Sequence, residues 1–440
     1  TIDDQYEGDF TQRRVLLYTL RFTAKTYLFG PASSASKDII KKSTVSLLTG
    51  KDTTNSKREV TYSVTPRAIK DYTGEVETTI TEDITTSTRA FDVVDASGLT
   101  AKTYIETARK GIASLLNALP QEIIFTSGGT ESDNMILSCA VKDLNVKTII
   151  SSPIEHHAVI HALDALKKNQ KINVRYLKLD AQGNIDLNDL EESLKIDNSK
   201  KLVSLMHVNN EIGNILNLHE VGNLCHNNNA LFHTDAVQGV GHYLFDLKNL
   251  PVDFLSSASH KYHGPKGIGF SFVRKNSGLE PFIYGGAQER GLRAGTESVH
   301  NIVGMHEALE ISHKKLEVEK KQILFLKNHF KKGLIEIFPN VHFNGNSSEN
   351  NLSTYTLLNV ALPIDEKKAS LLDFHLDLKG IACSKGSACQ SGSSQGSHVL
   401  NHIQNQKIKK MSSLRFSFSS FNNIDEVDYV LETLKEFVTQ

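Results

Sequence analysis

Short apolar runs alternate with helical patterns along most of the chain after residue 100. The first run, Ile123–Thr126, is followed by a glycine-containing turn that leads into a helical pattern. Six later runs also predict strands: Lys147–Ser151, Val174–Leu179, Leu202–Val208, Ala230–Thr234, Val252–Leu255 and Gly267–Val273. Strands that alternate with helices form a mostly parallel sheet with both faces covered. The pattern therefore predicts an α/β domain.

A smaller region with a different pattern follows this domain. A long, charged, amphipathic helix is predicted from about Ser298 to Ile337. Beyond it, strands are predicted near Thr354–Ala361 and Leu414–Ser419, and a last helix near Ile424–Val438. This order of elements predicts a small α+β domain at the C-terminal end.

The first hundred residues lack such a pattern. Residues 51–97 are rich in threonine and have poor periodicity, so they predict only short strands or loops. The character of the chain changes near Gly98. We therefore expect three parts: a divergent N-terminal region of residues 1–97, a large domain of residues 98–310 and a small C-terminal domain of residues 311–440.

Composition narrows the class of protein. The 440 residues are 39% hydrophobic and 22% charged, with a net charge of −1, so the chain should be globular and should bind neither nucleic acid nor a membrane surface directly. Its four cysteines show neither paired metal spacing nor a dense disulfide framework, which favours a reducing compartment and no metal site. Acidic residues precede Arg13 and argue against a leader peptide, so we expect a cytoplasmic protein.

Lys261 is the most informative candidate for chemistry. It follows Ser259 and His260 and precedes the glycine-containing run His263–Gly267. A lysine on a surface turn is usually only solvated. However, the apolar run before Asp235 predicts a carboxylate at the C-terminal end of a buried strand, where sites form in such sheets. A lysine that binds pyridoxal 5'-phosphate (PLP) needs a setting of this kind.

Cys389 is the second candidate. The segment from Gly386 to Gly396 consists of small and polar residues, which predicts a mobile loop. A thiol that attacks in one place and delivers in another needs such mobility. Cys383 follows two apolar residues and is predicted to end a strand instead.

Eight segments in this order resemble PLP-dependent enzymes of the class V aminotransferase family, specifically the cysteine desulfurases of the iron–sulfur-cluster type. In chain order they are Thr126–Asn134, Glu155–Val159, His207–Gly213, Asp235–Gln238, His260–Lys261, Gly285–Gly291, Ser387–Cys389 and Leu414–Ser417. The resemblance covers the chain from about Gly98 to Gln440. It implies the type I PLP-transferase fold, with a seven-stranded, mostly parallel sheet in the large domain.

The resemblance implies which residues hold the phosphate of the cofactor. Gly129 and Thr130 match the phosphate-binding turn, which in isolation would be an ordinary helix start. The family often has a serine three residues before the lysine, where this chain has Ala258; phosphate contacts from Ser259 and His260 are expected, and which hydroxyl serves is open. Thr296 matches a residue that reaches the phosphate of a partner subunit, so a homodimer is expected.

The resemblance also implies roles around the cofactor ring. Lys261 carries the cofactor, and His156 stacks on the ring and assists catalysis. Asp235 pairs with the pyridine nitrogen, where a carboxylate keeps the ring protonated. Asn210 and Gln238 match residues near the phenolic oxygen.

The implied substrate is L-cysteine. Arg415 matches the guanidinium that binds the substrate carboxylate, with Asn210 close by. Cys389 matches the nucleophile, which takes the sulfur as a persulfide and leaves L-alanine. The sulfur would then pass to an acceptor such as an iron–sulfur scaffold or a tRNA-thiolation relay protein.

Two alternatives remain open from the sequence. The Asn-Ala-Thr-Thr stretch with which the family opens does not occur in the first hundred residues. The chain could therefore be an inactive or weakly active relative that binds PLP and acts as an assembly partner. It could also be another class V enzyme, such as a selenocysteine lyase.

Overall fold

The computed structural model describes most of the chain after residue 92. The described ranges are residues 2–6, 16–27, 43–48, 57–62, 73–81, 93–364, 366–384 and 396–439. Side chains are described from residue 101 onward within these ranges, apart from Glu366, Lys367 and Ser370. The chain divides into two compact units, Thr1–Lys102 and Thr103–Gln440.

The first unit is built from antiparallel strands. Strand β2 (Leu16–Tyr27) pairs with β1 (Ile2–Tyr6) on one side and with β5 (Thr73–Thr81) on the other. Strands β3 (Ser43–Leu48) and β4 (Lys57–Tyr62) form a separate antiparallel pair. Threonine is β-branched and suits extended backbone, which accounts for the threonine-rich composition of β5.

A seven-stranded sheet forms the centre of the second unit, as expected. The strands are β6 (Ile123–Thr126), β7 (Thr148–Ser151), β8 (Asn173–Tyr176), β9 (Lys201–Ser204), β10 (Leu231–Asp235), β11 (Phe254–Ala258) and β12 (Gly269–Val273). Their order in the sheet is β6-β12-β11-β10-β9-β7-β8. Strand β12 runs antiparallel to both of its neighbours, and the other pairs are parallel. Each of the seven strands corresponds to an apolar run in the sequence.

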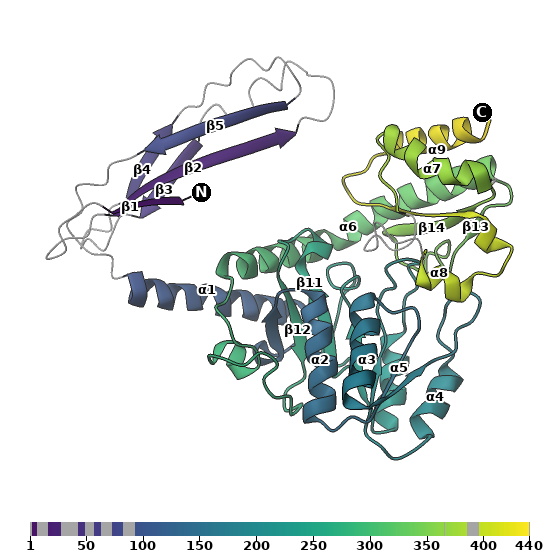
Figure 1. The fold of residues 1–440 in the computed structure, drawn as a ribbon, viewed down its shortest axis with the longest axis horizontal. Coiled ribbons are helices and arrows are strands. Elements are labelled where there is room, and N and C mark those ends of the chain that lie inside the picture. Colours follow the sequence, from purple (N-terminus) through teal and green to yellow (C-terminus); the bar gives the residue numbers. More distant parts are fainter. Residues whose placement is uncertain are drawn as a thin grey trace. The chain divides into compact units, whose positions relative to one another are not determined.

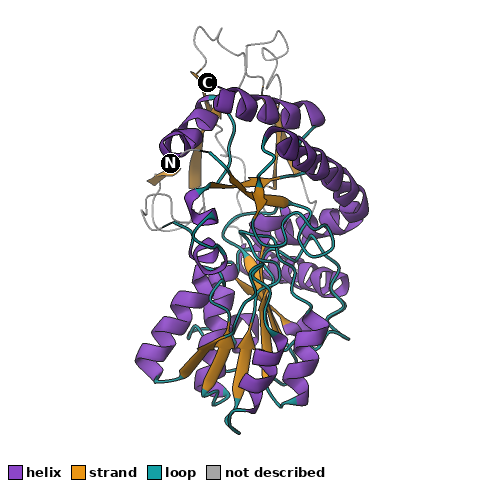
Figure 2. Cartoon of the chain, turned by 90° about the vertical axis from the view of Figure 1, so that its right-hand side faces the viewer, coloured by secondary structure: helices purple, strands orange, loops and turns teal. Residues whose placement is uncertain are grey.

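Helices cover both faces of this sheet (Figures 1 and 2). The helices of the sheet region are α1 (Val93–Leu115), α2 (Gly129–Asp143), α3 (His157–Gln170), α4 (Leu187–Lys195) and α5 (Leu218–Asn227). Neighbouring residues of a strand belong to two hydrophobic cores, one on each face of the sheet. Val203 packs with side chains of α1, α4 and α5, whereas Leu202 packs with those of α2 and α3. The two-residue period of a strand thus explains why central strands such as β9 carry consecutive apolar residues.

A smaller antiparallel sheet, β13-β14-β15, lies in the C-terminal part of the second unit. Its strands are β13 (His342–Phe343), β14 (Leu357–Leu362) and β15 (Ser412–Ser417), and its helices are α7 (Glu366–Leu378), α8 (His398–Ile403) and α9 (Ile424–Thr439). Helix α6 (Val299–Ile337) runs from the large sheet region to this part (Figure 1). The division predicted at residues 310 and 311 falls inside α6 and stays a prediction.

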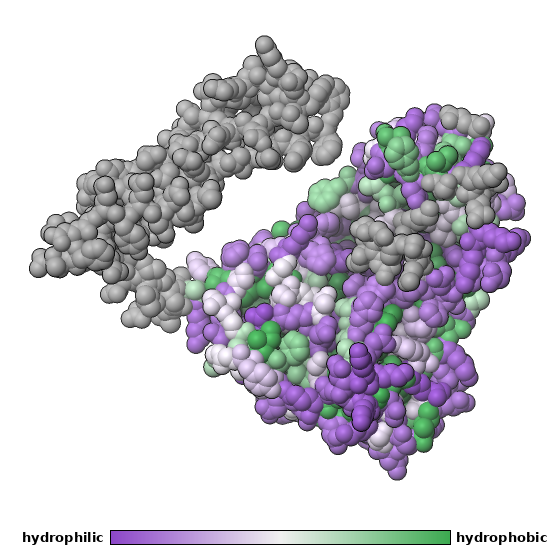
Figure 3. Space-filling view, in the orientation of Figure 1, coloured by the Kyte–Doolittle hydropathy of each residue, from purple (hydrophilic) through white to green (hydrophobic). Residues whose placement is uncertain are grey.

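Two further features describe the surface and the boundary of the units. Hydrophilic residues predominate on the face of the second unit drawn in Figure 3. Among the described helices, none has the length and apolar character needed to cross a bilayer. Gly98, where the sequence pattern changes, lies inside α1 and not in a linker.

Candidate active site

The candidate site forms where the parallel strands of the large sheet end. The segments that follow β6, β7, β9, β10 and β11 carry nearly all of the residues predicted to bind cofactor. Carboxyl ends of parallel strands meet at one edge of a sheet, and ligands bind outside that edge. The topology therefore brings together residues that are more than a hundred positions apart in the sequence.

The turn after β6 opens helix α2 without a side-chain cap. Gly128 occupies the N-cap position with φ 147°, a conformation that favours glycine. A Cβ atom on Gly129 would lie 2.6 Å from Cγ2 of Val237, so α2 packs directly against the segment after β10. The first backbone N–H groups of an uncapped helix can bind an anion, since they have no partner within the helix.

Ser259 adds a hydroxyl near this turn. It begins the 3₁₀ turn η3 (Ser259–Tyr262), directly after β11, and its side chain is fully buried. Its Oγ has no hydrogen bond of ordinary geometry to another described residue. A buried hydroxyl normally has a partner. A bound phosphate would supply one.

His156 is fixed at the start of α3. Its Nδ1 accepts a hydrogen bond of 3.2 Å from the backbone N–H of Ala158. The proton of the neutral ring must then be on Nε2. The ring thus has one tautomer and one orientation, as a group stacked on a cofactor ring requires.

Asp235, the last residue of β10, is buried and accepts a hydrogen bond of 3.0 Å from the N–H of Val237. Burial raises the pKa of its carboxyl, and the nearby His156 and Lys261 act in the opposite direction. These two interactions place the imidazole, the amine and the carboxylate at one site.

Two more buried carboxyl groups lie close to Asp235. Burial and the charge of Asp235 raise the pKa of Asp133 well above its usual range, and burial raises that of Glu155 to about 8. His156 and Lys261 lower the pKa of Asp235, whereas the charge of Asp235 raises the pKa of the other two carboxyls, so among the three the charge is favoured on Asp235. An ionised Asp235 is the state that can pair with a protonated pyridine nitrogen.

Lys261 lies in η3 and is held through its backbone. Its carbonyl oxygen lies 3.0 Å from Nε2 of His242, and Nδ1 of the same ring lies 3.1 Å from the hydroxyl of Tyr355. If Nε2 donates to the carbonyl, Nδ1 accepts from the tyrosine. Neither His242 nor Tyr355 was predicted, because nothing in their local sequence signals a role.

A cavity of about 200 Å³ unites four of the predicted residues. Lys261, Gln238, Asn210 and Arg415 all line it. Arg415 comes from β15 of the smaller sheet, and its Nη1 donates a hydrogen bond of 2.7 Å to the carbonyl oxygen of Asn210. The cavity thus places the predicted cofactor lysine and the predicted carboxylate-binding arginine around one space.

The other predicted residues do not line this cavity: Gly129, Thr130, His156, Asp235, Ser259 and His260 lie at or after the ends of β6, β7, β10 and β11 instead. Thr296 is exposed and does not line it. Cys389 lies in residues 385–395, outside the described residues. Cys383 is half-buried, and burial, with a contribution from Asp373, raises the pKa of its thiol to about 11. Its thiol is therefore a poor nucleophile at neutral pH. The prediction that Cys383 ends a strand is wrong: it precedes Ser384, which forms an isolated bridge with Arg415.

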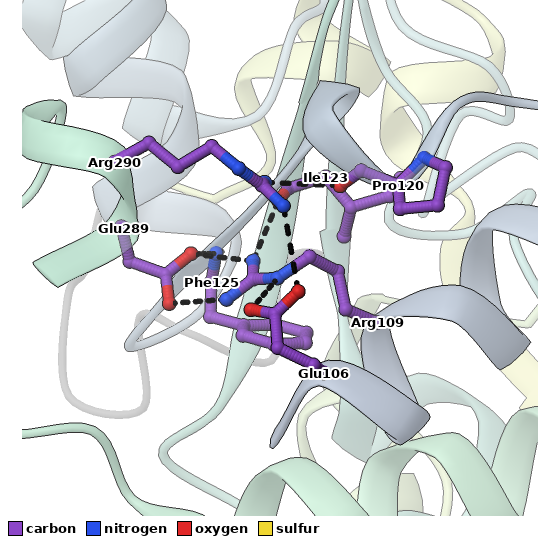
Figure 4. A network of polar contacts seen from close by, with 7 residues as sticks. All are labelled: Glu106, Arg109, Pro120, Ile123, Phe125, Glu289 and Arg290. Carbon is purple, nitrogen blue, oxygen red and sulfur yellow. Dashed lines mark hydrogen bonds and ion pairs between the residues drawn. The ribbon is translucent and has the colours of Figure 1, made fainter. Parts of the chain in front are cut away.

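A buried ionic network next to the site was not predicted from the sequence (Figure 4). Arg109 of α1 makes two hydrogen bonds to Glu289, at 2.7 and 2.9 Å, and a third at 2.7 Å to the carbonyl oxygen of Ile123. Arg109 and Glu289 are separated by 180 residues. No local pattern could signal this pair.

Comparison with known proteins identifies two family matches in different parts of the chain. Residues 84–430 match the class-V aminotransferase family. Residues 1–88 match a different family, the T4-like virus Myoviridae tail sheath stabiliser. The first match explains the site. The second offers a reason why the opening motifs of the desulfurases are missing from the first hundred residues.

Relatives and solved structures agree with the first match. The cysteine desulfurase IscS of Methanosarcina thermophila is 40% identical over 344 residues, which is 78% of this chain and 83% of the relative. That of Dictyoglomus turgidum is 38% identical over 346 residues, or 78% of this chain and 85% of the relative. A NifS-like protein of known structure superposes with a TM-score of 0.71 and 34% identity, covering 79% of this chain and 90% of that one.

The chain belongs to the class-V aminotransferase family of PLP-dependent enzymes. Within that family it falls among the cysteine desulfurases. The predicted family, fold class, enzyme class and cofactor are therefore confirmed. PLP also fits the residues present, because α2 and Ser259 offer donors for a phosphate and Asp235 offers a carboxylate for the ring nitrogen.

Proposed function

We propose that the cleft between Lys261 and Arg415 is where this chain removes sulfur from L-cysteine. The observation that carries the proposal is the cavity of about 200 Å³ that both side chains line, together with Asn210 and Gln238. A guanidinium recognises a carboxylate through two parallel hydrogen bonds, and a lysine amine near neutral pH can exchange protons with a carbon acid. The cleft thus offers both groups to one small amino acid.

Bound PLP would supply an electron sink for negative charge that develops on the substrate carbons. Gly129, Thr130, Ser259 and His260 would hold its phosphate. Asp235 would keep a proton on the ring nitrogen, and His156, with its single tautomer, would cover the ring face. These roles rest on the positions of the residues at the ends of β6, β7, β10 and β11.

The remaining steps belong to Lys261 and Cys389. Lys261 would take the proton from the α-carbon of the bound cysteine and return protons later. The Cys389 thiolate would attack the substrate sulfur, so that a sulfur–sulfur bond forms while the carbon–sulfur bond breaks. The electron pair stays on the former side-chain carbon, which is protonated to the methyl group of L-alanine. Cys389 keeps the sulfur as a persulfide.

The sulfur of the persulfide must pass to an acceptor, in a reducing compartment. We infer that the acceptor is a protein thiol on an iron–sulfur scaffold or a tRNA-thiolation relay protein, and that the enzyme works in the cytoplasm as a homodimer. Support for the dimer is the exposed position of Thr296, which lies away from the cavity of its own subunit. A partner subunit could use it as a phosphate contact.

The first unit supports a second, additional role. Residues 1–88 match a tail sheath stabiliser family, and strands β1 to β5 form antiparallel pairs of their own. We propose that this unit binds a protein assembly and brings the desulfurase to it. Sedimentation of the whole chain with purified sheath assemblies would test this role, with a chain that starts at Val93 as the control.

Desulfuration is tested directly by incubating the PLP-loaded protein with L-cysteine and measuring sulfide and L-alanine in equal amounts. Lys261→Ala should abolish both products. A parallel reaction with L-selenocysteine separates the two substrates. A protein that binds PLP, yet forms no alanine from cysteine, would support the assembly-partner alternative and overturn the proposed activity.

A further inference from the structure

An ion pair links the turn after β6 to a distant loop. Nε of Arg293 lies 2.7 Å from Oε1 of Glu131, and its Nη2 lies 3.1 Å from Oε2. The same carboxylate accepts a hydrogen bond of 2.9 Å from the backbone N–H of Ser127. One carboxylate therefore joins the first residue of the turn to a loop more than 160 residues later.

The position of Glu131 creates an electrostatic difficulty for an anion site. Glu131 lies in the first turn of α2, where the helix dipole and free N–H groups would bind the phosphate of PLP. Burial raises the pKa of Glu131, but the hydrogen bonds from Arg293 and Ser127 outweigh burial and hold it below its usual value. The carboxylate is thus ionised at neutral pH, and its charge would repel a phosphate dianion.

Arg293 supplies the opposite charge at a fixed place. Its loop contains Glu289, which is buried and accepts two hydrogen bonds from Arg109 and one of 2.8 Å from the N–H of Phe125 in β6 (Figure 4). The loop is therefore attached to the same strand that leads into the turn. A side chain held in place by its surroundings loses little freedom when it forms an ion pair.

We infer that Arg293 is a positioning residue for the cofactor: by pairing with Glu131 it neutralises the start of α2 and holds the turn in the shape that accepts a phosphate. The inference rests on the proposed PLP site. It adds that the ion pair with Arg293 allows the start of α2, where the Glu131 carboxylate lies, to bind a phosphate dianion. It concerns the phosphate alone. The ring, the lysine and the substrate are bound by other residues.

The test compares binding of PLP with binding of pyridoxal, which lacks the phosphate. Both are titrated into the apoenzyme and followed by absorbance or fluorescence. Arg293→Met leaves an unpaired carboxylate at the helix start, so it should weaken PLP by about tenfold or more while pyridoxal changes by less than about twofold. Glu131→Gln should weaken PLP less. The double variant should bind PLP better than Arg293→Met alone, because the repelling charge is gone.

Matched variants keep the result interpretable. Arg293→Lys retains the charge and should bind PLP closer to wild type than Arg293→Met does. Arg290→Met removes a neighbouring arginine of the same loop, whose partners are Glu106 and the carbonyl oxygen of Pro120, and should leave PLP binding unchanged. Equal losses of PLP and pyridoxal, or a double variant as weak as Arg293→Met, would overturn the inference. Failure of the wild-type apoenzyme to bind PLP would instead overturn the proposed site.

Discussion

The guanidinium of Arg415 donates a hydrogen bond of 2.7 Å to the carbonyl oxygen of Asn210 and so connects β15 to the segment after β9. Its Nη2 also lies 3.3 Å from Oγ of Ser384, the last described residue before the segment that contains Cys389. Arg415 therefore contacts both the large-sheet side of the cleft and the start of the cysteine segment.

Arg415→Lys tests the role in substrate binding. A lysine keeps the charge but cannot donate two parallel hydrogen bonds, so KM for L-cysteine should rise by about tenfold or more. PLP binding should stay within about twofold of wild type, since Arg415 is not among the cofactor residues. The measurements are steady-state alanine production and a PLP titration. An unchanged KM would show that another group binds the carboxylate.

Cys389 and Cys383 should differ sharply in sulfur transfer. Cys389→Ser should abolish sulfide release and still bind PLP, because only the thiolate can take the sulfur. Cys383→Ser should retain most activity, since the pKa of the Cys383 thiol is raised to about 11 by burial. Mass spectrometry after addition of cysteine should find the extra sulfur on Cys389. Finding it on Cys383 would contradict the assignment.

Lys327 predicts a specific pH dependence of stability. It is fully buried in α6, and its Nζ donates to Oγ of Ser353 and to the carbonyl oxygen of Thr354. Burial lowers its pKa from 10.5 to about 8. Between these values the unfolded chain binds more protons, so the folded state gains stability as the pH rises from about 8 to 10.5 and loses it as the pH falls.

The measurement is the free energy of unfolding of wild type relative to Lys327→Met at pH 7 to 10. The difference should shift in favour of wild type with rising pH, by on the order of 2–3 kcal/mol in total. Lys332→Met, at an exposed position of the same helix, serves as the control and should show no such shift. A pH-independent difference for Lys327→Met would show that the lysine keeps an ordinary pKa.

The second unit should fold without the first. A chain that starts at Val93 keeps helix α1 whole, whereas one that starts at Gly98 would cut it. The buried residues of α1, such as Ala108 and Ile112, pack in the core of the large sheet. We expect the shorter chain to fold cooperatively and to bind PLP within about threefold of the whole chain. Loss of PLP binding would show that residues 1–92 contribute to the site.

The large sheet was predictable because most of its strands are buried on both faces and so read as short apolar runs, although the edge strand β8 is partly exposed. Asp235 was predictable for the same reason, since it ends such a run. The positions at which strands end were harder to predict. Strand β9 ends at Ser204, although the run predicted as a strand continues through Leu205–Val208. An apolar residue can be buried in a loop as well as in a strand, and the sequence does not distinguish the two.

Contacts between distant residues could not be predicted. Arg109 and Glu289 are 180 residues apart and meet where both bond to the backbone of β6, and Glu131 and Arg293 are 162 residues apart. For residues 51–97 the sequence predicted only short strands or loops, and their bounds could not be given because β5 shows little alternation between apolar and polar positions. The structure places β4 and β5 there.

Helix α6 contributes to the two hydrophobic cores on either side of the cleft. Ile302, Met305 and Leu309 near its start belong to the core of the large sheet, and Leu326, Phe330 and Leu334 near its end belong to the core of the small one. Between them, Leu316 and Ile323 line the cleft itself. An uninterrupted helix of 39 residues bends only gently. The two sheet regions that carry Lys261 and Arg415 therefore pack on one continuous helix and not on separate elements joined by a loop.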